Sequence, residues 1–200
     1  MMRGRFVAFL VPLILGADVC VAQTLTPALD FARRQPIVEG QGLGGIQIGD
    51  TEEEIRKKMG SPLRVHQSPD GLKRDLRYAA VGPGQEWGII FDITLTLARG
   101  GAEAILLIVV RRPPTPYEYL GHTTRGYRPG EPPARALALY GKPDEILAGP
   151  PGSDELWWYR SLGLLIVPGE RSIMGQSQAK LAVIRRNLTP AELRGIVLGP

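Results

Sequence analysis

Apolar and polar side chains alternate along the middle of the chain. In the stretch IIFDITLTL, the apolar residues from Phe91 to Leu97 are separated by Asp92, Thr94 and Thr96. This period of two is typical of a β-strand with one buried face. Five other stretches, rich in β-branched, aromatic and leucine residues, also predict strands: LRYAAV, AILLIVV, ELWWYR, LGLLIVP and KLAVIRR.

Two segments 81 residues apart share the residues that fix the shape of the backbone. They are GIQIGDTEEEIRKKMGSPLRV at 45–65 and GYRPGEPPARALALYGKPDEI at 126–146, and glycine and proline stand at matching positions in both. Each segment predicts a short helix that ends at a Gly-x-Pro sequence. In the first segment, Asp50 or Thr51 is the expected N-cap.

We expect an α+β fold of two tandem repeats, each a short helix (or helix pair) packed on an antiparallel sheet of about three strands. One unit of about 65–70 residues buries little apolar surface, so two copies together form a larger core. The predicted boundaries are a signal peptide at 1–22, an N-terminal extension at 23–42, repeat 1 at 43–112, a Pro-rich linker at 113–123, repeat 2 at 124–186, and a C-terminal short helix and tail at 187–200.

The first 22 residues have the pattern of a secretory signal peptide. Arg3 and Arg5 precede the apolar run FVAFLVPLILG, which is too short to span a bilayer, and residues 20–22 offer a cleavage site. We expect export and cleavage near Ala22, which gives a periplasmic or secreted protein. Two alternatives stay open here: the apolar run is retained as an anchor, or Cys20 is lipidated.

Charge and cysteine content exclude two classes of protein. The formal net charge is +4, and without residues 1–22 the chain has 22 basic and 19 acidic side chains. This small, evenly spread charge is not that of a nucleic-acid-binding protein. The one cysteine lies in the signal segment, so the exported part has no disulfide and its stability depends on packing.

The sequence GDTEEEIRKKMGSP and the aromatic strand Trp157-Trp158-Tyr159 give the chain a family resemblance. It resembles the small BamE/SmpA-type outer-membrane assembly lipoproteins. Its duplication over residues 43–186 is similar to the β-lactamase inhibitor protein (BLIP-like) family. The resemblance implies an exported helix-plus-sheet protein without catalytic activity, which binds other proteins through the open face of its sheet. No residue identifies β-lactamase as the target.

Motifs for cofactor, metal and catalytic sites have simpler explanations. GQGLGG at 40–45 fits G-x-G-x-x-G but lacks the strand–turn–helix context of a dinucleotide site, so we expect an entry loop. The two histidines, His66 and His122, have no further ligands at metal-binding spacing. The serines have no recognisable nucleophile setting. We therefore expect no cofactor, no metal site and no enzymatic activity.

Trp157 and Trp158 are adjacent, and side chains alternate across a strand. The 81-residue match places Trp157 with apolar Leu76 and Trp158 with Arg77. We therefore expect Trp157 to face the helices and Trp158 to be an exposed binding anchor on the open face. The alternative is that the neighbouring repeat or the C-terminal helix covers Trp158. Arg77 on the same face and Asp70 at a hairpin tip complete the predicted partner-binding residues.

These expectations lead to a class of function. We predict an exported, non-enzymatic protein-binding module of the cell envelope or secreted fluid, acting as an assembly factor or an inhibitor. The second hypothesis is a glycan- or peptidoglycan-binding module in which Trp158 and Tyr159 stack on sugar rings. A third is an enzyme whose site the sequence does not reveal.

Overall fold

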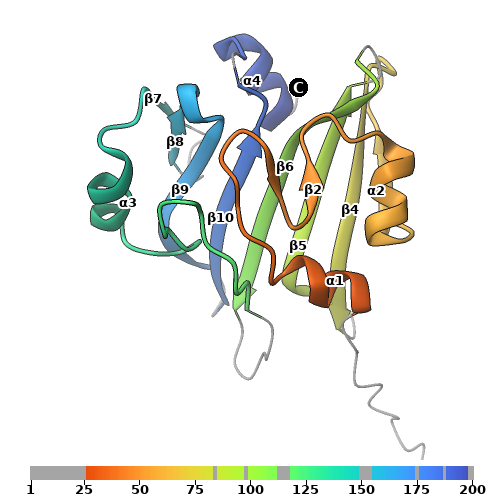
Figure 1. Cartoon of the computed structure of the whole chain (residues 1–200), viewed down its shortest axis with the longest axis horizontal. Helices are drawn as coiled ribbons and strands as arrows, with labels where there is room; N and C mark the ends of the chain where they lie inside the picture. Colours follow the sequence, from red (N-terminus) through yellow and green to blue (C-terminus); the bar gives the residue numbers. More distant parts are fainter. Residues whose placement is uncertain are drawn as a thin grey trace, which may run out of the picture.

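In the computed structural model, one antiparallel sheet of eight strands extends through the molecule (Figure 1). The structure describes residues 26–82, 85–96, 99–111, 118–148, 155–173, 176–186 and 188–197, so the predicted signal segment lies outside the described residues. The strands follow one another across the sheet in the order β3 (Arg64–Gln67), β4 (Lys73–Gly82), β5 (Gln85–Thr96), β6 (Gly101–Arg111), β10 (Gln176–Ile184), β9 (Leu164–Ile173), β8 (Glu155–Tyr159) and β7 (Glu145–Ala148).

The predicted fold class is wrong, because the structure is not two helix-on-sheet repeats of about three strands each. The described residues are mostly sheet: one sheet of eight strands, a second sheet of two strands and only four short α-helices. The two halves are joined by β6 and β10, which pair from Ala104 opposite Ile184 to Arg111 opposite Ser177. One continuous sheet therefore replaces the two separate units.

The composition of β6 and β10 explains why these strands lie in the middle of the sheet. β6 contains AILLIVV and β10 contains LAVI, apolar runs without the alternation seen in β5. Both faces of β6 are buried, Leu107 in one apolar cluster and Ala104 in another. A strand that is buried on both faces belongs in the interior of a sheet, where both of its edges are paired.

One face of the sheet, the front face, is covered by three helices and the small sheet (Figure 1). The main apolar core lies between this layer and the large sheet, and it includes the aromatic side chains of Phe91, Tyr127 and Trp157. The covering elements are α1 (Pro27–Ala32), the strand pair β1 (Gly42–Leu43) and β2 (Ile46–Gln47), α2 (Glu52–Met59) and α3 (Pro133–Tyr140).

The predicted ends of α2 and α3 are confirmed. Thr51 is the N-cap of α2 and forms a capping box. Gly60 ends α2 and Gly141 ends α3, with φ angles of 81° and 76° that side chains other than glycine rarely adopt. The carbonyl oxygens of these glycines accept hydrogen bonds of 3.2 Å from the hydroxyls of Tyr78 and Tyr159. The same contact therefore ties each helix to the sheet.

We predict that Thr51→Ala lowers the free energy of unfolding by about 1 kcal/mol. The Thr51 hydroxyl accepts a hydrogen bond of 3.3 Å from the amide of Glu54, which has no other partner in the first turn of the helix. Urea unfolding followed by circular dichroism measures the loss. Thr51→Ser keeps the hydroxyl and is expected to stay within a few tenths of a kcal/mol of the wild type. Equal losses in both variants would contradict the capping role.

The opposite face of the sheet, the back face, is covered at one end by α4 (Pro190–Val197). Leu193 of α4 and the preceding Leu188 pack with Trp158 and Leu165 in a second, smaller apolar cluster. The short C-terminal helix expected from the sequence is therefore present. It lies over the part of the sheet formed by β8, β9 and β10.

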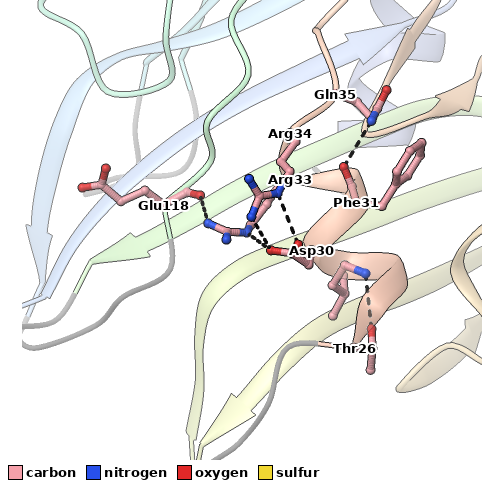
Figure 2. A network of polar contacts seen from close by, with 8 residues as sticks. Thr26, Asp30, Phe31, Arg33, Arg34, Gln35 and Glu118 are labelled. Atoms are coloured by element: carbon pink, nitrogen blue, oxygen red, sulfur yellow. Dashed lines mark hydrogen bonds and ion pairs between the residues drawn. The ribbon is translucent and has the colours of Figure 1, made fainter.

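The N-terminal extension and the described part of the linker pack against each other. Asp30 of α1 pairs with Arg33 at 2.6 Å, and a guanidinium nitrogen of Arg33 lies 3.5 Å from the main-chain oxygen of Glu118 (Figure 2). Tyr119 is buried and donates its hydroxyl to the main-chain oxygen of Gln35 at 2.8 Å. These contacts hold two segments more than 80 residues apart in the chain on the front face.

Candidate functional site

The back face holds two of the predicted partner-binding residues, Trp158 and Arg77. Strand pairing places both in a single row that crosses all eight strands. From β7 to β3, this row consists of Glu145, Trp158, Leu165, Ala182, Leu106, Asp92, Arg77 and Arg64. The row therefore shows which part of the back face each predicted residue occupies.

Trp158 is buried, so the expectation of an exposed tryptophan is wrong. Its exposed fraction is 0%, because Leu188 and Leu193 pack against it from the C-terminal segment. The guanidinium of Arg160 lies 4.6 Å from the centre of its ring. The stated alternative, in which the C-terminal helix covers Trp158, describes the structure. Trp157 is in the front-face core as expected.

Ion pairs surround the contact between α4 and the sheet. Glu192 lies 3.8 Å from Arg99 and 3.6 Å from Arg185, and both guanidinium groups also approach the buried carboxylate of Glu103. Arg194 of α4 pairs with a strand carboxylate at 3.9 Å. These distances are longer than hydrogen bonds, and such partly exposed pairs contribute little. The position of α4 therefore depends mainly on its apolar contacts.

Arg77 lies on the back face of β4, as expected. Its guanidinium donates two hydrogen bonds to the carboxylate of Asp92 on β5, at 2.6 and 2.7 Å. Two parallel bonds of this kind fix the orientation of both side chains. The Arg77 side chain stays about one-third exposed (34%). The pair is thus a rigid polar element on the surface of the sheet.

Asp70 lies in the exposed turn between β3 and β4. Its carboxylate accepts hydrogen bonds from the Ser68 hydroxyl and, at 2.9 Å, from the amide of Leu72. The bond from Ser68, followed by the one from Leu72, lowers the pKa of Asp70 below its ordinary value. An aspartate that bonds to residues two positions away is typical of a turn. The structure therefore gives Asp70 a local role in the hairpin.

The three predicted residues are not brought together. Trp158 and Arg77 lie on β8 and β4, which are five strand spacings apart in the sheet. At about 4.8 Å per spacing, this separation is roughly 24 Å. Asp70 lies beyond the start of β4, at the hairpin tip. A compact ligand cannot contact all three residues, and only Arg77 and Asp70 offer exposed surface to a partner, because Trp158 is fully buried.

Another part of the back face begins two residues along β5, β6, β10 and β9 from the row of Trp158 and Arg77, and the apolar contacts of α4 do not include its residues. Ile108 of β6 and Lys180 of β10 are directly opposite each other there, and both are half-buried. Ile108 and its neighbours Ile90, Val110 and Val167 belong to neither apolar cluster. The three neighbours are buried, with 6%, 3% and 6% of their surface exposed, so Ile108 is the apolar residue of this set that stays partly open. We call this area, defined by these five residues, the central back face. Our sequence reasoning missed it because it searched for aromatic anchors, although AILLIVV is apolar on both faces.

The two histidines considered as metal ligands lie in different parts of the structure, and the stretch considered as a dinucleotide motif is separated from the next helix. No group of three His, Cys, Asp or Glu side chains among the described residues could hold a metal ion. His66 is exposed on β3, and Nδ1 of His122 lies 2.9 Å from the main-chain oxygen of Thr123. The GQGLGG stretch continues into the small sheet, and the next helix begins only at Glu52.

No helix in the described part of the chain has the length and apolar character needed to cross a bilayer.

Comparison with known proteins gives no family assignment. No protein-family model, no curated protein and no solved structure matches this chain. The resemblance to BamE/SmpA-type lipoproteins and to the β-lactamase inhibitor protein family therefore stays a prediction. The function has to be argued from the geometry of the site.

Proposed function

We propose that this chain is an exported, non-enzymatic protein-binding module of the cell envelope or secreted fluid, and that its partner contacts the central back face. One observation supports this function above all. Three helices cover the front face and α4 covers one end of the back face, while no described helix packs on the central back face. A sheet normally buries each apolar face against another layer. Here a partner protein contacts Ile108, the apolar side chain of this area that stays half-buried.

The chemistry of the central back face suits a protein partner. Half-buried Ile108 is in the middle, above the buried side chains of its apolar neighbours, and Lys180 and the fixed Arg77–Asp92 pair lie around it. An apolar centre with a polar margin is typical of protein interfaces. The glycan hypothesis required open rings at Trp158 and Tyr159, which are 0% and 3% exposed. We therefore put forward the protein partner.

We predict that Ile108→Lys reduces recovery of the partner at least tenfold, a loss of about 1.4 kcal/mol in binding free energy. A lysine stem can stay in contact with the sheet while its ammonium group reaches water, so the fold is preserved. The full-length chain and the variant are immobilised side by side and exposed to envelope and culture-fluid proteins of the source cells. Bound proteins are quantified by mass spectrometry.

Lys57→Glu on α2 is the control, because this exposed residue lies on the front side and pairs with Glu53. It is expected to recover the partner as the wild type does. Circular dichroism confirms that both variants are folded. Recovery of the same proteins in the same amounts by wild type and Ile108→Lys would rule out the central back face as the binding site.

A further inference from the structure

Helices α2 and α3 have the same surroundings but opposite surface chemistry. Both end at a glycine with positive φ whose carbonyl accepts a tyrosine hydroxyl at 3.2 Å. Residues 53, 56 and 57 of α2 correspond, 81 residues on, to residues 134, 137 and 138 of α3. Positions spaced by three and four lie on one side of a helix. The two sets can therefore be compared directly.

On α2 these positions are charged. Lys57 pairs with Glu53 at 2.9 Å, and Arg56 pairs with Glu52 at 2.7 Å. On α3 the same positions are Ala134, Leu137 and Ala138, and all three are exposed. Leu137 leaves 42% of its surface in solvent. A solvated helix favours the α2 pattern, so the apolar side of α3 requires another explanation.

The neighbouring edge strand adds to this apolar surface. Ile146 of β7 is 54% exposed and lies opposite Trp157, a residue of the front-face core. Ile146 therefore points to the same side of the sheet as α3. The indole N–H of Trp157 is buried and has no hydrogen-bond partner. We call Ala134, Leu137, Ala138 and Ile146 together the α3–β7 surface.

Positive charge surrounds this surface. Residues 125–142 contain four basic side chains and one carboxylate, whereas residues 44–61, 81 positions earlier, contain three basic and four acidic ones. The four basic residues are exposed and form no ion pair among the described residues: Arg125, Arg128, Arg135 and Lys142. The nearby carboxylates already have partners. Glu131 accepts a hydrogen bond from the amide of Arg128, and Asp144 accepts one from the amide of Arg160. Glu145 forms ion pairs with the guanidinium groups of Arg160 and Arg194.

We propose that the α3–β7 surface binds an acidic, apolar segment of a partner protein. Leu137 and Ile146 contact its apolar side chains, and the surrounding arginines and lysine pair with its Asp and Glu residues. Charge complementarity of this kind directs encounter and selects the partner. A second copy of the chain fits less well, because two such surfaces would bring like charges together. This site goes beyond the proposed function, since it lies on the side of the sheet opposite the central back face.

Photo-crosslinking in the source cells tests the proposal. p-Benzoylphenylalanine replaces Leu137 in the full-length chain, and a matched variant carries it at Arg56 of α2. We expect position 137 to crosslink to protein segments in which Asp and Glu outnumber Lys and Arg next to apolar residues, and position 56 to give none of these products. With Arg135→Glu and Lys142→Glu added, the yield at position 137 falls at least fivefold.

Four results would overturn the proposal. Position 137 could give no crosslinked product, or positions 137 and 56 could give the same products. The product at position 137 could also contain a second copy of this chain, or lipid. Phosphatidylglycerol vesicles mixed with the purified chain check the lipid result independently, and sedimentation velocity checks the second-copy result. Ile108→Lys is expected to leave the product at position 137 unchanged. The experiments therefore distinguish a wrong proposal for the central back face from a wrong proposal for the α3–β7 surface.

Discussion

Replacement of Trp158 by alanine is expected to lower the free energy of unfolding by about 3–5 kcal/mol. The side chain is fully buried between the back face of the sheet and the leucines of the C-terminal segment. Its removal leaves a cavity that the strands, held by their hydrogen bonds, cannot close. Thermal unfolding followed by circular dichroism is expected to show a midpoint lowered by about 10 °C or more.

Leu193→Ala is the companion variant, because it removes the contact from the side of α4. It is expected to cost about 2–3 kcal/mol and to leave the front-face core intact. An unchanged unfolding midpoint in Trp158→Ala would show that Trp158 is not a core residue and would restore it as an exposed anchor. The expected loss also means that Trp158→Ala is unsuitable as a binding variant, since lost binding would reflect lost stability.

The second large effect is expected at Glu39, whose replacement by alanine should cost about 3 kcal/mol at pH 7. Glu39 is 6% exposed, and its carboxylate accepts hydrogen bonds from the hydroxyls of Thr124 at 2.6 Å and Tyr140 at 2.7 Å. These bonds join the N-terminal extension to the residue that follows the linker and to the end of α3. Alanine would leave both hydroxyl groups without this acceptor, and urea unfolding measures the cost.

The contribution of Glu39 depends on pH in a defined direction. Burial acts to raise the pKa of Glu39, but the hydrogen bonds from Thr124 and Tyr140 outweigh burial and hold the pKa below its ordinary value. Ionised Glu39 therefore stabilises the fold above the unfolded-state pKa of about 4.3, and this stabilisation is lost as the pH falls through the folded-state pKa. The difference in unfolding free energy between wild type and Glu39→Gln should be constant above about pH 5.5 and shrink below about pH 4.5.

Glu118→Gln is the matched control, because Glu118 is exposed and, among the described residues, contacts Arg33 through its main-chain oxygen and not through its carboxylate. The unfolding free energy of Glu118→Gln is expected to stay close to that of the wild type across the same pH range. A Glu39→Gln difference that does not change between pH 7 and pH 3 would contradict a role for the ionised carboxylate in the fold.

The candidate site could be predicted from the sequence only in part. Alternation along a strand correctly separated Trp157 from Trp158 and placed Arg77 on the back face. The prediction that Trp158 is exposed was wrong, because its burial depends on α4, which lies about 30 residues later in the chain. The pairing of Arg77 with Asp92 requires β4 and β5 in one register, and no local pattern specifies a register between separate strands.

Local features of this protein follow from short stretches of its sequence. The helix ends at Gly60 and Gly141, the N-cap at Thr51 and the buried side of β5 each depend on a few neighbouring residues. Which apolar surfaces meet depends on the whole fold: β6 joins β10 in one sheet, and α4 covers Trp158. Such contacts depend on the free energies of competing arrangements of segments far apart in the chain. The pattern of one segment does not contain that comparison.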